Sequence, residues 1–97
     1  MRISKVIGKL TMNRTLPDIV PGSYLIVRPC DRKALAGGEP SGDELVLYDN
    51  LGASAGDLLG MVEGREATQP FRPKKVPFDA YSACILDTVD FRPVLEV

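Results

Sequence analysis

The chain has 97 residues, of which 44% are hydrophobic and 26% charged, and its formal net charge is −1. This composition is typical of a soluble globular domain, so it excludes a disordered tail and argues against a dedicated nucleic-acid binder, which needs a large basic surplus. No apolar run reaches the roughly 18 residues of a membrane span, and the opening residues lack the apolar core of a signal peptide. We therefore expect a single cytosolic domain over residues 1–97, with neither a membrane nor a nucleic acid as its partner.

Two features of the composition restrict the chemistry. The chain has no histidine and only two cysteines, Cys30 and Cys84. It thus lacks the usual acid–base group near neutral pH, and two cysteines without histidine match a structural zinc site poorly. Each cysteine falls in an apolar segment, which predicts reduced, buried thiols that pack as small apolar side chains. We expect no catalytic residues, no metal and no cofactor.

The first half of the chain contains two predicted strands. Residues 2–12 alternate in pattern but carry apolar side chains on both faces, which indicates a strand covered partly on each side. Residues 13–22 form a connector with two prolines and a glycine. The aliphatic segment 24–30 predicts a second, buried strand, and the glycine-rich, charged segment 31–42 predicts an exposed loop with little regular structure.

The second half continues the same pattern. Residues 44–48 predict a third strand, which ends in a loop of small residues at 49–57. A fourth strand follows directly at 58–62. Residues 64–69 predict a single helical turn, too short to be stable without tertiary contacts. Residues 70–77 contain three prolines and are not expected to form regular structure.

The C-terminal segments complete the predicted fold. Residues 81–89 predict a fifth strand, and residues 91–97 form a partly apolar tail. Short strands separated by glycine and proline connectors predict an all-β fold, a small closed or nearly closed barrel with one helical turn. A barrel of this size buries only about 60–65% of its unfolded surface, so we expect self-association to add burial.

Five short motifs follow one another along the chain in the order, and at nearly the spacing, that one protein family shares. Their residues are, in order, Met1, Ile3, Val6 and Gly8; Gly22, Leu25, Ile26 and Val27; Asp49, Leu51, Gly52, Ala53, Gly56 and Asp57; Val62, Gly64 and Ala67; and Pro77, Asp79, Ala80, Ile85, Asp87 and Val89. With these motifs the chain resembles the EutN/CcmL family, the pentameric vertex proteins of bacterial microcompartments, over nearly its whole length. It departs from the family pattern at Ser54, where the loop usually has glycine, and within residues 12–15 and 65–75.

The resemblance implies a fold, an assembly and partners. The fold is a five-stranded OB-like barrel, and the assembly is a homopentamer that caps the five-fold vertices of a polyhedral shell around encapsulated enzymes. The implied partners are further copies of the chain together with hexameric and trimeric shell proteins. The implied location is the microcompartment shell in the bacterial cytoplasm, and the implied role is structural rather than enzymatic.

The resemblance also suggests two sets of functional residues. The loop of small residues is expected to converge with its copies on the five-fold axis and line a narrow pore, with Ser54 as the narrowest ring, although the loop also has the composition of a simple tight turn. Its residues are Gly52, Ala53, Ser54, Ala55 and Gly56. Candidates for contacts with other subunits or with hexamers are Arg14, Asp49, Arg65, Arg72, Asp87, Phe91 and Leu95.

Two other functions remain open from the residues alone. Asp49, Asp57, Asp79 and Asp87 suggest acid–base catalysis, but no nucleophile, base and oxyanion donors occur in a recognisable order, and turn capping explains Asp49 and Asp79 as well. Because OB-like barrels often bind oligonucleotides, an OB-like nucleic-acid-binding domain is the alternative function. It would use the basic cluster Arg72, Lys74 and Lys75 beside Phe71 and Phe78, which a solvated loop or a contact with acidic shell proteins explains equally.

Overall fold

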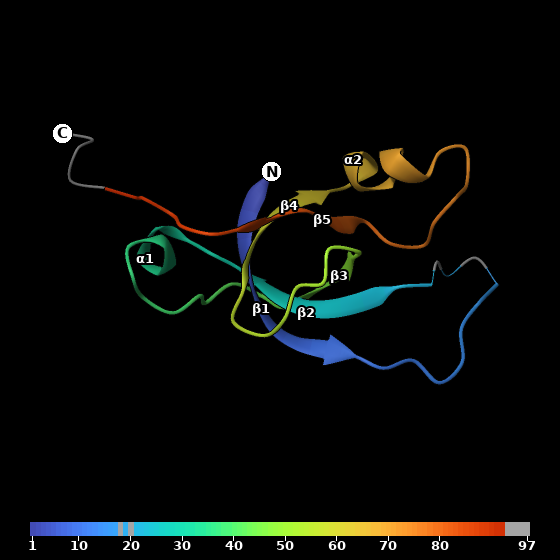
Figure 1. Cartoon of the computed structure of the whole chain (residues 1–97), viewed down its shortest axis with the longest axis horizontal. Helices are drawn as coiled ribbons and strands as arrows, with labels where there is room; N and C mark the ends of the chain where they lie inside the picture. Colours follow the sequence, from blue (N-terminus) through green and yellow to red (C-terminus); the bar gives the residue numbers. More distant parts are fainter. Residues whose placement is uncertain (18, 20, 93–97) are drawn as a thin grey trace.

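A computed structural model describes residues 1–17, 19 and 21–92 and shows a closed five-stranded barrel (Figure 1). The strands close in the order β1-β2-β3-β5-β4, and all neighbours are antiparallel except β3 and β5, which pair in parallel through Tyr48 and Tyr81. The predicted all-β, OB-like barrel is confirmed. The strands are β1 (Arg2–Leu10), β2 (Ser23–Pro29), β3 (Leu45–Asp49), β4 (Leu58–Glu63) and β5 (Ala80–Leu86).

The barrel interior is filled by inward-facing side chains from all five strands. They form one cluster of buried residues: Val6, Leu25, Val27, Leu47, Leu59, Met61 and Ala80. The pairing of β1 with β2 shifts between Val6 and Gly8, and the intervening Ile7 is exposed. This bulge interrupts the alternation of side chains, which bends the strand as barrel closure requires.

The helical content is greater than expected. The predicted turn at 64–69 is α2 (Arg65–Thr68), and it runs into a 3-10 turn, η1 (Gln69–Phe71), inside the segment that we expected to be irregular. The expectation of an irregular loop at 31–42 is wrong in part, because α1 (Arg32–Leu35) forms there. Asp31 caps this turn by accepting a hydrogen bond from the backbone amide of Ala34, and that bond outweighs the glycines that follow.

Two strands are shorter than predicted. Strand β1 ends at Leu10 rather than at residue 12, and β5 ends at Leu86 rather than at residue 89. For β5 the ladder partner ends first, since Leu86 pairs with Leu58, the first residue of β4. The register of β1 ends where Leu10 pairs with Tyr24, one residue inside β2. A strand whose partner has ended has no further main-chain bonds to gain.

An aromatic cluster anchors the long connection between β4 and β5. The rings of Tyr48 and Phe78 stack with centroids 4.9 Å apart, and Phe71 meets Phe78 edge-on at 5.1 Å. Tyr24 and Tyr81 extend the cluster from β2 and β5. The amide of Gly64 donates to the carbonyl of Asp79, 2.8 Å away, and so closes the base of the connection. Residues 64–79 are therefore a folded cap on the barrel rather than a free loop.

The two helical segments lie at opposite ends of the molecule. In Figure 1, α1 lies near one end of the long axis, with the last described residues beside it, and α2 lies toward the other end. The guanidinium of Arg32 lies 5.5 Å from the ring centroid of Phe91, which fixes the chain after β5 against α1. Within residues 1–17, 19 and 21–92, the helices are too short to span a membrane.

Candidate functional site: the loop between strands β3 and β4

The loop of small residues between β3 and β4 is tied down at its start by a buried carboxylate. Asp49, the last residue of β3, is only 1% exposed. One of its oxygens accepts hydrogen bonds from the backbone amides of Gly52 and Ala53, both at 3.0 Å. The other accepts a bond from the hydroxyl of Ser82 on β5, itself 1% exposed. A single side chain thus connects two strands and the loop.

The end of the same loop is held by main-chain contacts with β1 and by a second carboxylate. The amide of Gly56 donates to the carbonyl of Val6, and the amide of Val6 donates to the carbonyl of Asp57, both at 2.9 Å. The carboxylate of Asp57 accepts a bond from the amide of Ser54 at 2.9 Å. The loop is therefore fixed on both sides.

Two glycines allow the loop to adopt this path. Gly52 and Gly56 have φ values of +85° and +94°, in the left-handed region that side chains disfavour. Between them, Ala53 is partly buried and packs against the core, while Ser54 and Ala55 are exposed. The result is a rigid tip of small side chains directed into solvent, which is a surface that other chains can approach closely.

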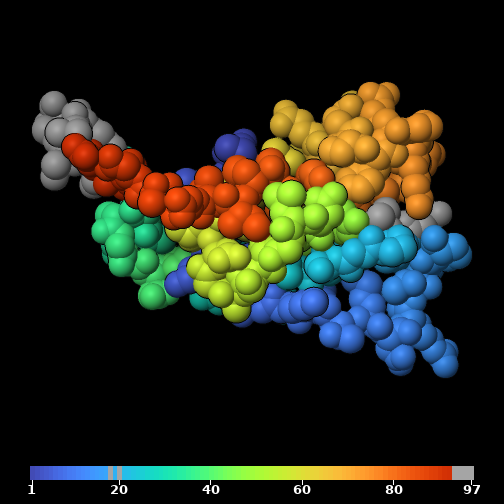
Figure 2. Space-filling model, viewed as in Figure 1, coloured from blue at the N-terminus to red at the C-terminus, as the bar shows by residue number. Residues whose placement is uncertain are grey.

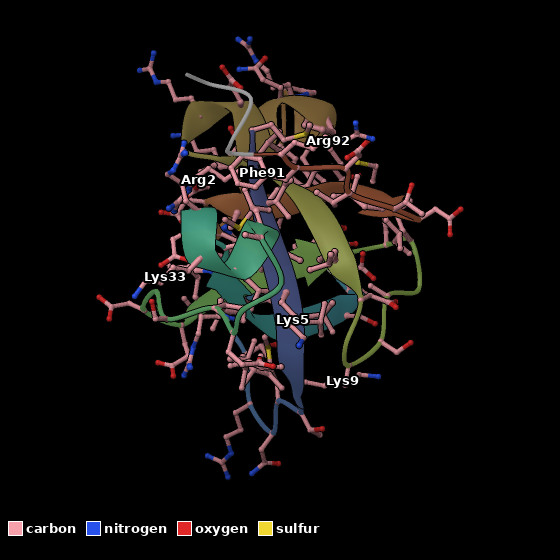
Figure 3. All side chains as sticks on the ribbon, turned by 90° about the vertical axis from the view of Figure 1, so that its left-hand side faces the viewer. Arg2, Lys5, Lys9, Lys33, Phe91 and Arg92 are labelled. Atoms are coloured by element: carbon pink, nitrogen blue, oxygen red, sulfur yellow. The ribbon has the colours of Figure 1, made fainter. Side chains whose placement is uncertain are left out.

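The other candidate contact residues are scattered over the molecule. Arg14 is exposed in the connector between β1 and β2, and Asp87 is exposed just after β5. Arg65 and Arg72 are exposed, and the structure brings them together on the cap formed by residues 64–79. Phe91 is partly buried beside α1, as Figure 3 shows. Leu95 lies outside the described residues.

Several apolar side chains are exposed on the outside of the barrel. Ile7, Val46 and Ile85, on β1, β3 and β5, are 43%, 45% and 41% exposed. Val46 lies opposite Ile26 on β2, so two of the strands share an apolar strip on their outer side. Exposed apolar area of this kind on several strands is typical of a surface that binds other chains.

The side chains give no indication of a metal centre or of reactive thiols. In the described part of the chain, histidine, cysteine, aspartate and glutamate side chains form no group of three or more suited to a metal ion. Cys30 and Cys84 are free thiols, as predicted, but they are only partly buried, so the expectation of buried side chains is wrong. Burial still raises the pKa of the Cys30 thiol above its usual value, which disfavours the reactive thiolate.

The packing of Phe71 and Phe78 argues against the alternative function of nucleic-acid binding. Phe71 and Phe78, which flank the basic cluster in sequence, are both partly buried and pack against Tyr48 and each other. Single-strand binders present aromatic faces to the bases, and these rings already have protein neighbours. The alternative is therefore not favoured.

Comparison with known families decides the relationship. Residues 1–87 match the family described as ethanolamine utilisation protein EutN/carboxysome. The chain belongs to the EutN/CcmL family. The resemblance inferred from the five sequence motifs is thereby confirmed. The solved structures similar to this chain include a family member described as a pentameric microcompartment shell protein, which is a structural role.

Several solved structures of family members resemble the barrel closely. EutN from Escherichia coli shares 27% sequence identity with a TM-score of 0.76, over 94% of this chain and 89% of that protein. CcmL from Gloeobacter violaceus shares 27% identity with a TM-score of 0.79, over 94% and 90%. GrpN, a pentameric microcompartment shell protein from Rhodospirillum rubrum, shares 26% identity with a TM-score of 0.77, over 95% and 100%. No curated protein sequence matches this chain.

Proposed function

We propose that the chain is a structural shell protein that assembles into a homopentamer and caps the five-fold vertices of a bacterial microcompartment. The observation that carries the proposal is the extent of the family likeness. The family match spans residues 1–87, and the superposition covers the full length of the pentameric shell protein from Rhodospirillum rubrum. No enzymatic activity is proposed, because the family is one of shell proteins.

Ring formation explains the exposed apolar side chains. When one surface of a chain binds a different surface of the next copy, the contact repeats until the ring closes and no interface is left unpaired. Ile7, Val46 and Ile85 provide apolar surface for such contacts. The added burial compensates for the small core of a 97-residue barrel. A five-fold ring placed among flat six-fold layers introduces the curvature that a closed shell needs.

The loop with residues 52–56 is proposed to line the five-fold axis. Its support is the rigid tip, where Ser54 and Ala55 are exposed and the two flanking glycines adopt left-handed conformations. Small side chains are required where several copies approach one axis. Ser54 is proposed as the narrowest ring.

The remaining contact candidates are assigned to the outer rim of the ring. Arg14, Arg65, Arg72 and Asp87 present exposed charges, and arginine suits such interfaces because its planar fork binds carboxylates bidentately. The proposed rim partners are hexameric and trimeric shell proteins, in a shell located in the bacterial cytoplasm. Phe91 and Leu95 are proposed to pack on the adjacent subunit. Asp49 contributes indirectly, by holding the axial loop.

Native mass spectrometry of the purified protein at low micromolar concentration, before and after moderate salt, tests the proposal. A dominant species of five chains is expected in both buffers, and a monomer in both would refute the vertex function.

Ser54→Glu tests the axial loop separately, because several like charges close to one axis repel each other. We expect this variant to dissociate at low salt and to recover at high salt. A stable ring in which Ser54→Glu has no effect would refute only the axial position of the loop.

A further inference from the structure

A depression on the cap formed by residues 64–79 carries concentrated positive charge. It has a volume of about 540 Å³, and its lining includes Arg65, Arg72, Lys74 and Lys75, together with Thr68 and Val76. We call this surface the basic hollow. Figure 2 shows the cap as a block of orange atoms toward one end of the molecule. Four of the twelve cationic side chains of the chain therefore gather at one place, although the whole chain has a net charge of −1.

The charges of the basic hollow have no ion-pair partners among the residues that the structure describes. Among the described residues, no aspartate or glutamate lines it, and none of its four cations forms an ion pair. Arg72 instead donates a hydrogen bond to the side-chain carbonyl of Gln69, 3.1 Å away. Four cations elsewhere in the described part of the chain do form ion pairs. These ion pairs are Arg2–Glu63, Lys5–Glu39, Arg28–Glu44 and Arg92–Asp90.

The segment that presents these cations is firmly anchored. Ala67 of α2 is fully buried, and the ring of Phe71 packs edge-on against those of Tyr48 and Phe78. The amide of Lys74 donates to the carbonyl of Phe71 at 2.8 Å. Because the backbone is already ordered, an anionic partner would lose little free energy in ordering the site. Uncompensated like charges held together in this way also favour binding of an anion, since it relieves their mutual repulsion.

From this geometry we infer that the basic hollow is a docking surface for an acidic segment of a partner protein, rich in aspartate and glutamate. An open surface with four spread cations fits an extended chain with several carboxylates, because each exposed contact is weak and only their sum gives affinity. A nucleic acid fits less well, since the adjacent rings pack against one another and offer no stacking face. Because Arg65 and Arg72 belong to the proposed outer rim, the inference rests on that assignment and adds the chemistry of the rim's partner. The surface belongs to one chain, so binding at it does not require ring formation.

Two matched double variants test this inference. Lys74→Gln with Lys75→Gln removes two charges from the basic hollow. Lys9→Gln with Lys33→Gln removes two charges that are also exposed but lie elsewhere, on β1 and on α1 at the far end of the molecule (Figures 1 and 3). Binding of a fluorescent deca-glutamate peptide is followed by anisotropy, and labelled deca-thymidylate serves as the competing polyanion. Thermal unfolding by circular dichroism establishes that both variants are folded.

The expected result is salt-sensitive binding of the peptide to the wild type that weakens about fivefold or more in the Lys74/Lys75 variant and less than about twofold in the control variant. Equal weakening in both variants, or no peptide binding, would refute the inference. Stronger binding of thymidylate than of the peptide through Lys74 and Lys75 would also refute it, in favour of a nucleic acid. Native mass spectrometry of the Lys74/Lys75 variant adds a further check. If this variant alone loses the assembly formed by the wild type, the hollow is a contact between copies and the inference is wrong.

Discussion

Removal of the Asp49 side chain should loosen the barrel and the loop together. In Asp49→Ala, the hydroxyl of Ser82 loses its acceptor, and the amides of Gly52 and Ala53 lose theirs. The appropriate control is Asp57→Ala, in which one carboxylate bond to the exposed amide of Ser54 is lost at the other end of the same loop. Asp49→Asn serves as a rescue variant. Its amide carbonyl can accept from the loop, and its NH₂ group can donate to the Ser82 hydroxyl.

The magnitude depends on burial. Ser82 is 1% exposed, so a hydroxyl left without a partner there costs about 1–3 kcal/mol. The two loop amides lie nearer the surface and can bind water instead, so their loss adds about 1 kcal/mol in total. We therefore expect Asp49→Ala to lower the free energy of unfolding by about 2–4 kcal/mol, against about 0.5–1 kcal/mol for Asp57→Ala. A typical domain has only about 5–15 kcal/mol in total, so the larger loss is severe.

Urea unfolding monitored by circular dichroism measures both losses. The protomer concentration must be the same in every experiment, because self-association stabilises the folded chain by mass action. We expect Asp49→Asn to recover at least half of the loss, since it restores acceptors for the loop and a donor for Ser82. The reasoning is refuted if Asp49→Ala and Asp57→Ala destabilise the protein equally, because the buried connection between β3 and β5 would then contribute nothing.

Two further predictions concern the sheet. In Gly60→Ala the new methyl group would lie 2.6 Å from the sulfur of Cys84 and 2.8 Å from that of Met1. We expect the free energy of unfolding to fall by about 1–3 kcal/mol, and the added change Cys84→Ala to relieve part of this loss in a double-mutant cycle. Additive losses in the two single variants would contradict the clash. The hydrogen bonds from Arg2 lower the pKa of Glu63 below its ordinary value of 4.5, so the stabilisation by the pair is fully present above that pH and is lost as the pH falls through the lowered pKa. Because both side chains are partly exposed to solvent, Glu63→Gln should cost less than about 1 kcal/mol in urea unfolding at pH 7, and the cost should shrink as the pH falls. A loss that does not depend on pH would exclude the ion pair as its cause.

Several features of the site needed no structure. The number of strands and their approximate positions follow from apolar segments bounded by glycine and proline. This pattern can be recognised from a few neighbouring residues at a time. The tight loop at residues 52–56 follows from its small residues, and the helical turn after Gly64 follows from the same local reasoning. The residue that caps α1 is also visible in the sequence, because Asp31 lies three residues before Ala34. The neighbouring glycines, however, favoured a loop without regular structure.

Other features depend on residues far apart in the chain. The partner of Asp49 is Ser82, 33 positions later, and neither residue by itself indicates the other. The aromatic cluster draws its rings from β2, β3, β5 and the connection before β5. The sequence shows only that Phe71 and Phe78 lie beside a basic cluster, whereas the structure shows that their packing anchors that segment to the barrel.

The sequence by itself determined the strands, their connectors and the family, because these depend on local conformational preference and on motifs read in order. Only the tertiary structure decided the parallel pairing of β3 with β5, the burial of Asp49 and the gathering of four cations in the basic hollow. The physical reason is barrel closure. Closure selects one pairing of distant strands from many that local preferences allow, and every contact between residues far apart in the chain follows from that selection.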